Sequence, residues 1–183
     1  MLLYHDDGSY TCLIDRGGVN QQAITDSSVS NPVRADFVCI AAGPAKASAA
    51  LLAGVPDDVP VAWIAKRDPD SFPAWLTRRL ARRADLIFCN TSERPMVDSS
   101  RSAGTRPGQA IIETRGADGV LLERSGHKLE MPCETVRARD ATGAGDTLAG
   151  EVIATLLSGI TDLETALRRG MDAARSLLLT RAR

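Results

Sequence analysis

The sequence is poor in aromatic residues, in histidine and in long hydrophobic runs. Aromatic residues make up 4% of its 183 residues, and only two residues are histidine. The two histidines show no metal-ligand spacing, so we expect neither a histidine metal site nor a histidine base. No apolar run approaches the roughly 18 residues of a membrane-spanning helix, and the N-terminal residues 1–4 are too short for the apolar part of a signal peptide. We therefore expect a soluble protein without a membrane partner.

The sequence also has few cysteines and a small net charge. The formal net charge is -1, which gives the chain no general attraction to nucleic acids or to anionic membranes. The cysteines form no C-x-x-C pair, and we expect them to be buried free thiols in a reducing cytoplasm. These are the four cysteines: Cys12, Cys39, Cys89 and Cys133. One predicted helix carries a basic stripe that we interpret as a solvated face: Arg78, Arg79, Arg82 and Arg83.

The N-terminal region reads as a hairpin followed by a connection. Two strand-like runs, residues 2–4 and 10–14, are separated by D-D-G-S. Asp-Gly between such runs is a strong hairpin signal, because the turn needs positive φ. The polar stretch that follows has no helical period. We therefore assign residues 1–34 to a hairpin with its connection, and residues 35–183 to a second, larger domain.

The larger domain alternates strand and helix. Apolar strand-like runs occupy residues 37–41, 59–65, 86–89 and 110–112. Helical spacing marks residues 45–52 and the set Phe72, Trp75, Leu76 and Leu80, with Asp70 or Ser71 as its cap. Residues 120–122 and 128–131 predict two antiparallel strands at one edge, and two long helices end the chain. Thr161 and Glu164 predict a capping box for the last helix. This alternation predicts an α/β fold, with a mainly parallel sheet and helices on both faces.

The strongest chemical signal is the segment D-A-T-G-A-G-D-T-L-A-G at residues 140–150. Its small residues allow a tight turn that exposes successive N–H groups, and an apolar helix begins there with its positive end at the same point. An aspartate inside such an anion site needs a task of its own, such as taking a proton from an attacking hydroxyl. The plainer interpretation is a glycine-rich helix start with Asp146 as a first-turn acid. The spacing fits neither a Rossmann fingerprint nor a Walker A loop.

Two further motifs follow strands. Residues 90–93 read N-T-S-E, which offers an amide and a carboxylate for a hydrated Mg²⁺. Taken alone, the same pattern is a helix cap with Glu93 at the third helical position. Residues 114–119 read T-R-G-A-D-G, which by itself indicates only a strand end and a tight turn.

In this order the three motifs resemble those of the ribokinase/PfkB carbohydrate kinase family. Residues 140–150 are similar to its D-T-T-G-A-G-D signature, with Ala141 as a departure. The resemblance implies a ribokinase-like Rossmann fold with an N-terminal lid hairpin, and an ATP-dependent kinase that phosphorylates a hydroxyl of a sugar or nucleoside. It also implies Mg²⁺, and K⁺ near Asp140, as cofactors.

The resemblance assigns a role to each matching residue. Asp146 would be the general base, and Gly143, Ala144 and Gly145 would form the phosphate-binding anion hole. Thr114, Gly116 and Gly119 would lie beside the nucleotide. Asn90 and Glu93 would hold Mg²⁺ through water.

The chain also departs from the family. It begins at the expected lid hairpin, so the glycine-rich sugar-binding segment is missing, and it stops before segments that close the adenine pocket. Where relatives often have D-x-N-x-R, residues 64–67 read I-A-K-R. A sheet without its first strands would expose an apolar edge, so we expect a homo-oligomer or association with a missing N-terminal half. The alternative function is a truncated, inactive relative that serves as a binding or assembly subunit.

Overall fold

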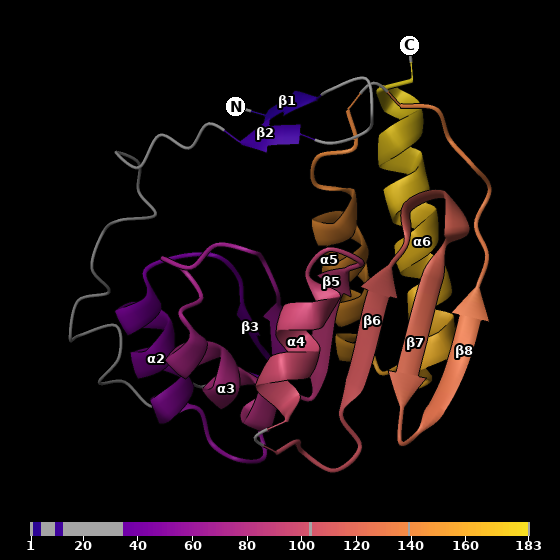
Figure 1. Cartoon of the computed structure of the whole chain (residues 1–183). Coiled ribbons are helices and arrows are strands. Elements are labelled where there is room, and N and C mark those ends of the chain that lie inside the picture. Colours follow the sequence, from indigo (N-terminus) through magenta and orange to yellow (C-terminus); the bar gives the residue numbers. More distant parts are fainter. Residues whose placement is uncertain (1, 5–9, 13–34, 103, 139, 183) are drawn as a thin grey trace.

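The N-terminal strands form a hairpin in the computed structural model, which describes residues 2–4, 10–12, 35–102, 104–138 and 140–182 (Figure 1). Strand β1 (Leu2–Tyr4) pairs antiparallel with β2 (Tyr10–Cys12), with Leu2 opposite Cys12. The predicted strand pair is thus confirmed for these residues. The predicted turn and the connection at 13–34 lie outside the described residues.

A second sheet of six strands forms the centre of the larger domain. The strand order along the sheet is β3-β4-β5-β6-β7-β8, so each strand pairs with its neighbours in the sequence. Strands β3 to β6 are parallel to one another, whereas β7 and β8 are antiparallel at the edge, as predicted. The strands are β3 (Val38–Ile40), β4 (Val61–Ile64), β5 (Leu86–Asn90), β6 (Ala110–Thr114), β7 (Val120–Arg124) and β8 (His127–Met131).

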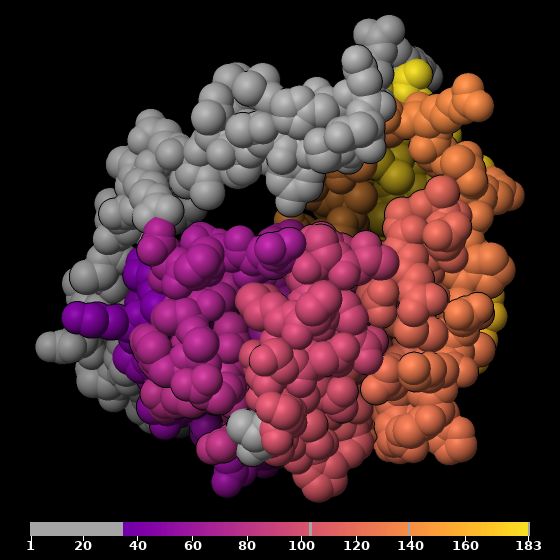
Figure 2. Space-filling view, viewed as in Figure 1, coloured from indigo at the N-terminus to yellow at the C-terminus, as the bar shows by residue number. Residues whose placement is uncertain are grey.

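Helices cover both faces of this sheet, as the sequence predicts (Figure 1). Parallel strands in sequential order, joined by right-handed crossovers, place all their connecting helices on one face. These helices are α2 (Ala45–Gly54), α3 (Ala74–Arg83) and α4 (Arg94–Arg101), whose surface Figure 2 shows in indigo to pink. The other face packs against α5 (Ala144–Leu157) and α6 (Leu163–Thr180). None of the helices in the described part of the chain is both long and apolar enough to cross a membrane.

Successive strand residues enter two separate cores. In β4, Val61 and Trp63 pack toward α2 and α3, whereas Ala62 between them packs toward α5 and α6. In β5, Ile87 and Phe88 divide in the same way, and none of these five side chains is more than 4% exposed. Both faces of a central parallel strand are buried, which explains why these strands appear in the sequence as unbroken apolar runs.

Helix α3 starts later than its apolar spacing predicts. It begins at Ala74 after Pro73, so neither Asp70 nor Ser71 is its cap. Phe72 precedes the helix and is 3% exposed, with its ring edge-on to Trp63 at a centroid distance of 5.9 Å. Trp75 is 44% exposed and does not share the buried side of the helix. Proline disfavours a helical conformation of the preceding residue, and this local rule overrode the spacing pattern.

The cap of α6 also differs from the prediction. Its N-cap is Asp162 and not Thr161, and the Asp162 carboxylate accepts the backbone N–H of Thr165 at 2.9 Å. The same carboxylate accepts the Thr165 hydroxyl, and both hydrogen bonds lower the pKa of Asp162. An aspartate that meets two donors is the stronger cap of two adjacent candidates.

The basic stripe on α3 is solvated only in part. Arg78, Arg79 and Arg82 are exposed, whereas the Arg83 side chain is 13% exposed. Its guanidinium donates to the carbonyl oxygens of Pro56 and Val59, at 2.6 and 2.7 Å. Arg83 therefore ties the end of α3 to the loop before β4, and the prediction of a wholly solvated stripe was wrong for this residue.

Of Cys39, Cys89 and Cys133, only Cys89 is buried. Cys39, Cys89 and Cys133 are free thiols, and burial raises the pKa of Cys89 to about 12. Cys39 is exposed because it lies on the edge strand β3, on the face that α5 and α6 leave open. Cys133 is exposed in the segment after β8. The prediction of free thiols is confirmed for these three, but the prediction of burial was wrong for two of them.

The two C-terminal helices approach each other closely at Gly170. A Cβ there would lie 2.8 Å from the carbonyl oxygen of Leu148 and 2.9 Å from Cγ2 of Val152. Leu148 and Val152 belong to α5 and are almost fully buried. Gly170 is therefore required by packing and not by its backbone conformation.

We predict opposite effects for two Gly→Ala substitutions in these helices. Gly170→Ala should lower the free energy of unfolding by about 1–3 kcal/mol, because the added methyl overpacks the helix interface. Gly150→Ala, in α5 with no atom within 4 Å of the new Cβ, should raise it by about 0.5–1 kcal/mol. Urea denaturation of both variants measures this. Equal stability of the two would show that α5 and α6 are not packed in this way.

Candidate active site

The three predicted motifs meet at one edge of the sheet. Asn90 ends β5 and lies opposite Thr114, the last residue of the neighbouring strand β6. Lys66 follows the end of β4 and lies within ion-pair distance of Asp146 at the start of α5. The carboxyl ends of three parallel strands therefore converge with one helix N-terminus, which is the usual ligand-binding edge of an open α/β sheet.

Helix α5 begins in a way that leaves its N-terminus open to a ligand. Gly143 immediately precedes it in a left-handed conformation, with φ of 79°, which glycine adopts without steric cost. The helix then starts at Ala144, and no side chain caps it. Since the first backbone N–H groups of a helix have no partner within it, this start can bind an anion. Gly143, Ala144 and Gly145 lie at this start, and the N–H of Ala144 donates to the carbonyl oxygen of Ala141 at 3.2 Å.

Asp146 lies in the first turn of α5 and is accessible. Its side chain is 54% exposed, and its Oδ1 lies 3.5 Å from Nζ of Lys66, which is 41% exposed. Sequence reasoning noted residue 66 only as a departure from a family pattern and did not predict this contact. A carboxylate and an ammonium thus face each other at the mouth of the anion site.

Residues 90–93 form the capping arrangement that their spacing allows. The Asn90 side-chain oxygen accepts the backbone N–H of Glu93 at 2.9 Å, and Oε2 of Glu93 accepts the backbone N–H of Asn90 at 2.8 Å. The two reciprocal bonds close the turn before α4, which begins at Arg94. The reciprocal bonds of the helix-cap interpretation are confirmed, but Glu93 precedes α4 and is not its third residue. It leaves further acceptor capacity on the Glu93 carboxylate.

Glu93 is buried, and the other charges of the site shift the pKa of its carboxyl. Only 5% of the residue is exposed, and burial raises the pKa of its carboxyl above the usual value. The hydrogen bond from Asn90 and the charges of Lys66 and Arg67 act in the opposite direction, and the charge of Asp146 raises this pKa further. Glu93, Lys66 and Asp146 therefore lie within electrostatic reach of one another.

The donor set suits a hydrated Mg²⁺ better than a directly ligated metal. No group of three or more His, Cys, Asp or Glu side chains among the described residues could hold a metal ion. Mg²⁺ keeps several waters and needs few protein oxygens, so the Asn90 and Glu93 side chains can bind it through those waters.

Residues 114–119 form a strand end and a tight turn. Thr114 ends β6, and a short 3₁₀ turn at Gly116–Asp118 is closed by a 2.8 Å bond from the Arg115 N–H to the Gly119 carbonyl. Gly116 has φ of 58° and open space around it, which suits a close ligand. At Gly119 a Cβ would lie 2.1 Å from the carbonyl oxygen of Met131. The packing of β8 is thus enough to explain that glycine.

The loop before the anion site is held by an arginine from the end of α6. The Asp140 carboxylate accepts the Thr142 backbone N–H at 2.8 Å. The Arg181 guanidinium donates to the Thr142 carbonyl oxygen and lies 3.6 Å from Oδ2 of Asp140. The oxygens that a K⁺ near Asp140 would use already face a positive charge.

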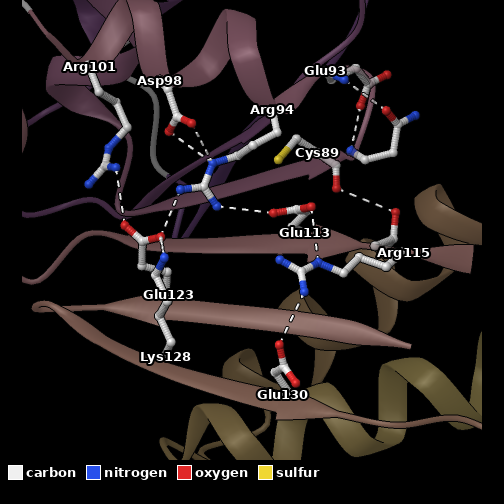
Figure 3. A network of polar contacts seen from close by, with 12 residues as sticks. Cys89, Glu93, Arg94, Asp98, Arg101, Glu113, Arg115, Glu123, Lys128 and Glu130 are labelled. Atoms are coloured by element: carbon white, nitrogen blue, oxygen red, sulfur yellow. Dashed lines mark hydrogen bonds and ion pairs between the residues drawn. The ribbon is translucent and has the colours of Figure 1, made fainter. Parts of the chain in front are cut away.

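Arg94 fixes α4, and with it the turn at residues 90–93, on the sheet (Figure 3). Its guanidinium is hydrogen-bonded to Asp98 in its own helix, to Glu113 on β6 and to Glu123 on β7. Burial opposes its charge, but the hydrogen bonds that Arg94 donates to Glu123 and Asp98 raise the pKa of Arg94 above normal. The network was not predicted, because Glu113 and Glu123 lie 19 and 29 positions after Arg94 in the sequence.

Further charges extend this network. Arg115 is bonded to Glu113 at 3.1 Å and to Glu130 at 3.3 Å, and Arg101 lies 3.6 Å from Glu123 (Figure 3). These contacts occupy β6 to β8 on the α4 side of the sheet, beyond the apolar core that α2 and α3 cover.

Curated proteins with similar sequences match only part of the chain. The bifunctional protein HldE of Nitrobacter hamburgensis is 41% identical over 68 residues, which is 37% of this chain and 14% of that protein. A 2-dehydro-3-deoxygalactonokinase of Haloferax volcanii is 34% identical over 76 residues, or 42% of this chain and 24% of that protein. The chain therefore spans a small part of the length of these relatives.

Solved structures match nearly the whole chain in fold. A ribokinase from Cryptococcus neoformans in complex with ADP has a TM-score of 0.77 at 20% identity, over 94% of this chain and 62% of that one. Aminoimidazole riboside kinase from Salmonella enterica has a TM-score of 0.72 at 17% identity, over 97% and 66%. At these identities the likeness establishes the ribokinase-like fold alone.

The assignment to a family comes from the sequence as a whole. The model of the pfkB family carbohydrate kinases matches residues 5–181, a range that includes all three motifs at the ligand-binding edge. The chain belongs to the pfkB family of carbohydrate kinases.

Proposed function

We propose that the chain carries out ATP-dependent phosphoryl transfer to a hydroxyl group of a sugar or nucleoside. The observation that carries the proposal is the placement of Asp146. It is half exposed at the uncapped start of α5, beside Lys66, in a chain of the pfkB family. Structural neighbours named as nucleoside kinases and ribokinases support the substrate class. The chain spans 50% and 62% of those two proteins, so the activity of the whole is part of the proposal.

In the proposed reaction Asp146 is the general base. The acceptor hydroxyl oxygen forms a bond to the γ-phosphorus of ATP, the bond from that phosphorus to ADP breaks, and the hydroxyl proton goes to the Asp146 carboxylate. The accessible carboxylate allows an acceptor to approach it.

The anion site stabilises charge on the transferred group. Backbone N–H groups of Gly143 and Gly145 would point at the phosphoryl oxygens, and that of Ala144 would join them by leaving the Ala141 carbonyl oxygen. The positive end of α5 adds to their effect. Lys66 adds a full positive charge at the same place. An ammonium 3.5 Å from the base can turn to a phosphoryl oxygen when ATP is present, because both side chains are partly solvated.

Asn90 and Glu93 would hold Mg²⁺ through water, where the ion would offset charge on the phosphates. Thr114 and Gly116 would lie along the nucleotide, since they end the strand next to Asn90. Gly119 belongs to the same proposed segment, although packing alone accounts for it.

The compartment and the partners remain predictions. The free thiols of the described cysteines favour a reducing compartment, and we propose the cytoplasm. In the described sheet β3 pairs only with β4, so its other edge is available to a second copy of the chain or to an N-terminal half.

Asp146→Asn tests the base. The variant keeps the size and polarity of the side chain, so turnover should fall by about 10²–10⁴-fold, the usual worth of general-base catalysis. The affinity for ATP should stay the same or rise slightly, because a negative charge near the γ-phosphate is removed. A coupled assay of ADP formation with a panel of sugars and nucleosides, plus nucleotide titration, measures both.

Asp172→Asn is the matched control, because Asp172 is an exposed aspartate on α6 outside the proposed site. It should leave turnover unchanged. If Asp146→Asn retains turnover within a factor of a few, the proposed base is wrong. If the unaltered chain binds nucleotide but phosphorylates no acceptor, the alternative of a binding or assembly subunit is favoured.

Lys66→Gln tests the contact with the transferred phosphoryl group. The affinity for an ATP analogue with a non-transferable γ-phosphate should fall by about two- to fivefold, the range for a partly solvated charge pair, while the affinity for ADP should not change. Isothermal titration calorimetry with saturating Mg²⁺ gives both constants. An equal loss of affinity for the ATP analogue and for ADP would show that Lys66 contacts another part of the nucleotide. Lys66→Arg should bind the ATP analogue as tightly as the unaltered chain.

Glu93→Gln tests the buried carboxyl through stability. Because burial raises its pKa above the unfolded value, the folded chain binds this proton more tightly than the unfolded chain. The resulting stability is complete below the unfolded pKa and is lost as the pH rises through the folded pKa. Glutamine keeps an oxygen for the Asn90 N–H without the charge. The variant should therefore be more stable than the parent near neutral pH, and the advantage should disappear in acid.

Urea denaturation over a pH series without Mg²⁺ measures this difference between the two chains. Turnover of the variant should fall and recover in part at higher Mg²⁺, as expected for a carboxylate that acts through the metal. A variant that is less stable than the parent at neutral pH would contradict the raised pKa.

A further inference from the structure

Arg181 reaches the loop before the anion site because α6 is longer than its partner helix. α5 has 14 residues and α6 has 18, a difference of about one turn. The two helices are joined by the short connection at residues 158–162 and pack against each other at Gly170. The end of α6 therefore extends past the start of α5 and brings Arg181 to the loop at residues 140–142.

The loop offers Arg181 a cation-binding set of oxygens. The guanidinium donates to the carbonyl oxygen of Thr142 and lies 3.6 Å from a carboxylate oxygen of Asp140. The other carboxylate oxygen of Asp140 accepts the Thr142 N–H, which holds the two oxygens in one turn. Carbonyl and carboxylate oxygens are also the ligands that hard metal ions prefer.

An arginine differs from an exchangeable ion in two respects. Its charge is permanent and covalently attached, so it is present whatever the salt composition. Its N–H donors also have fixed directions, whereas a spherical ion imposes no direction on the oxygens that it contacts. Without a cation here, the Asp140 carboxylate would repel the phosphates expected three or more residues further along, at the start of α5.

We propose that Arg181 is the built-in cation of this loop and takes the place of a monovalent metal ion such as K⁺. The role of the loop in phosphate binding rests on the proposed function, whereas the replacement of the ion does not. Arg181 is a positioning residue: it neutralises Asp140 and holds the segment that leads into Gly143. The chain should then bind nucleotide and unfold with no dependence on K⁺ beyond that of ionic strength.

The test compares K⁺ with tetramethylammonium, a cation too large for such a site, at equal ionic strength. Two quantities are measured on the full chain: the thermal unfolding midpoint without ligand, and the affinity for Mg-ADP. The variants are Arg181→Gln and Arg181→Lys. The control is Arg175→Gln. Arg175 belongs to the same helix but pairs with Glu134 and not with the loop at residues 140–142.

The unaltered chain, Arg181→Lys and the control should give the same midpoint and affinity in both salts. In Arg181→Gln, K⁺ should raise the midpoint and strengthen Mg-ADP binding by about two- to fivefold relative to tetramethylammonium, as expected for a partly exposed charge contact. Na⁺ and Li⁺ should act less than K⁺, since a site left by a guanidinium is wide.

Two results would overturn the inference. One is a K⁺ effect on the unaltered chain, which would show an ion site beside Arg181. The other is the absence of any K⁺ effect in Arg181→Gln. If Arg181→Gln does not fold, Arg181→Lys decides the question. The same midpoint and affinity in both salts, as in the unaltered chain, supports the role of the positive charge. A K⁺ effect that the unaltered chain lacks contradicts it. A chain that binds no Mg-ADP would refute the proposed function, yet the midpoints would still decide the role of Arg181.

Discussion

The burial of β4, β5 and β6 on both faces is the constraint on which the rest of the molecule depends. A strand with helices on either side cannot place a charged side chain in its middle without a large desolvation cost. Polar chemistry is therefore confined to the strand ends, where Lys66, Asn90 and Thr114 follow or end three neighbouring strands. The start of α5, which packs on one face of the same sheet, is directed to that edge as well. The position of the site follows from what the core excludes.

A second consequence appears where the helical cover ends. Beyond α4 the strands carry Glu113 and Glu123 on that face instead of valine or leucine. Arg94 compensates both carboxylates, and each bond offsets part of the cost of its burial. Replacing Arg94 by a neutral residue would remove this compensation from two partly buried carboxylates. The arrangement also holds α4, and hence the turn at Asn90, at a fixed height above the strand ends.

Most of the fold could be predicted from the sequence, because its signals are local. Apolar runs marked strands β3 to β7, and the spacing of Asn90 and Glu93 predicted their reciprocal hydrogen bonds. Errors arose where two local rules competed, as at Pro73 and at Thr161 beside Asp162. The contacts of Lys66 with Asp146 and of Arg181 with Thr142 had no local signal, because they join residues that only the packed helices bring together. Motif context predicts a role for Asp146, whereas the charges around it come from residues that are distant in the sequence.

The sequential order of the strands has a bearing on how the chain reaches its native state. Each strand of the large sheet pairs with the strand just before it, so no pairing must wait for a distant part of the chain. Low sequence separation between contacts favours rapid folding, since little loop entropy is lost before each contact forms. The strands can thus add to the sheet one βα unit at a time, in the direction of synthesis. α5 and α6 follow all six strands in the sequence and cover the second face, so on this route the turn at residues 143–145 would form after the sheet.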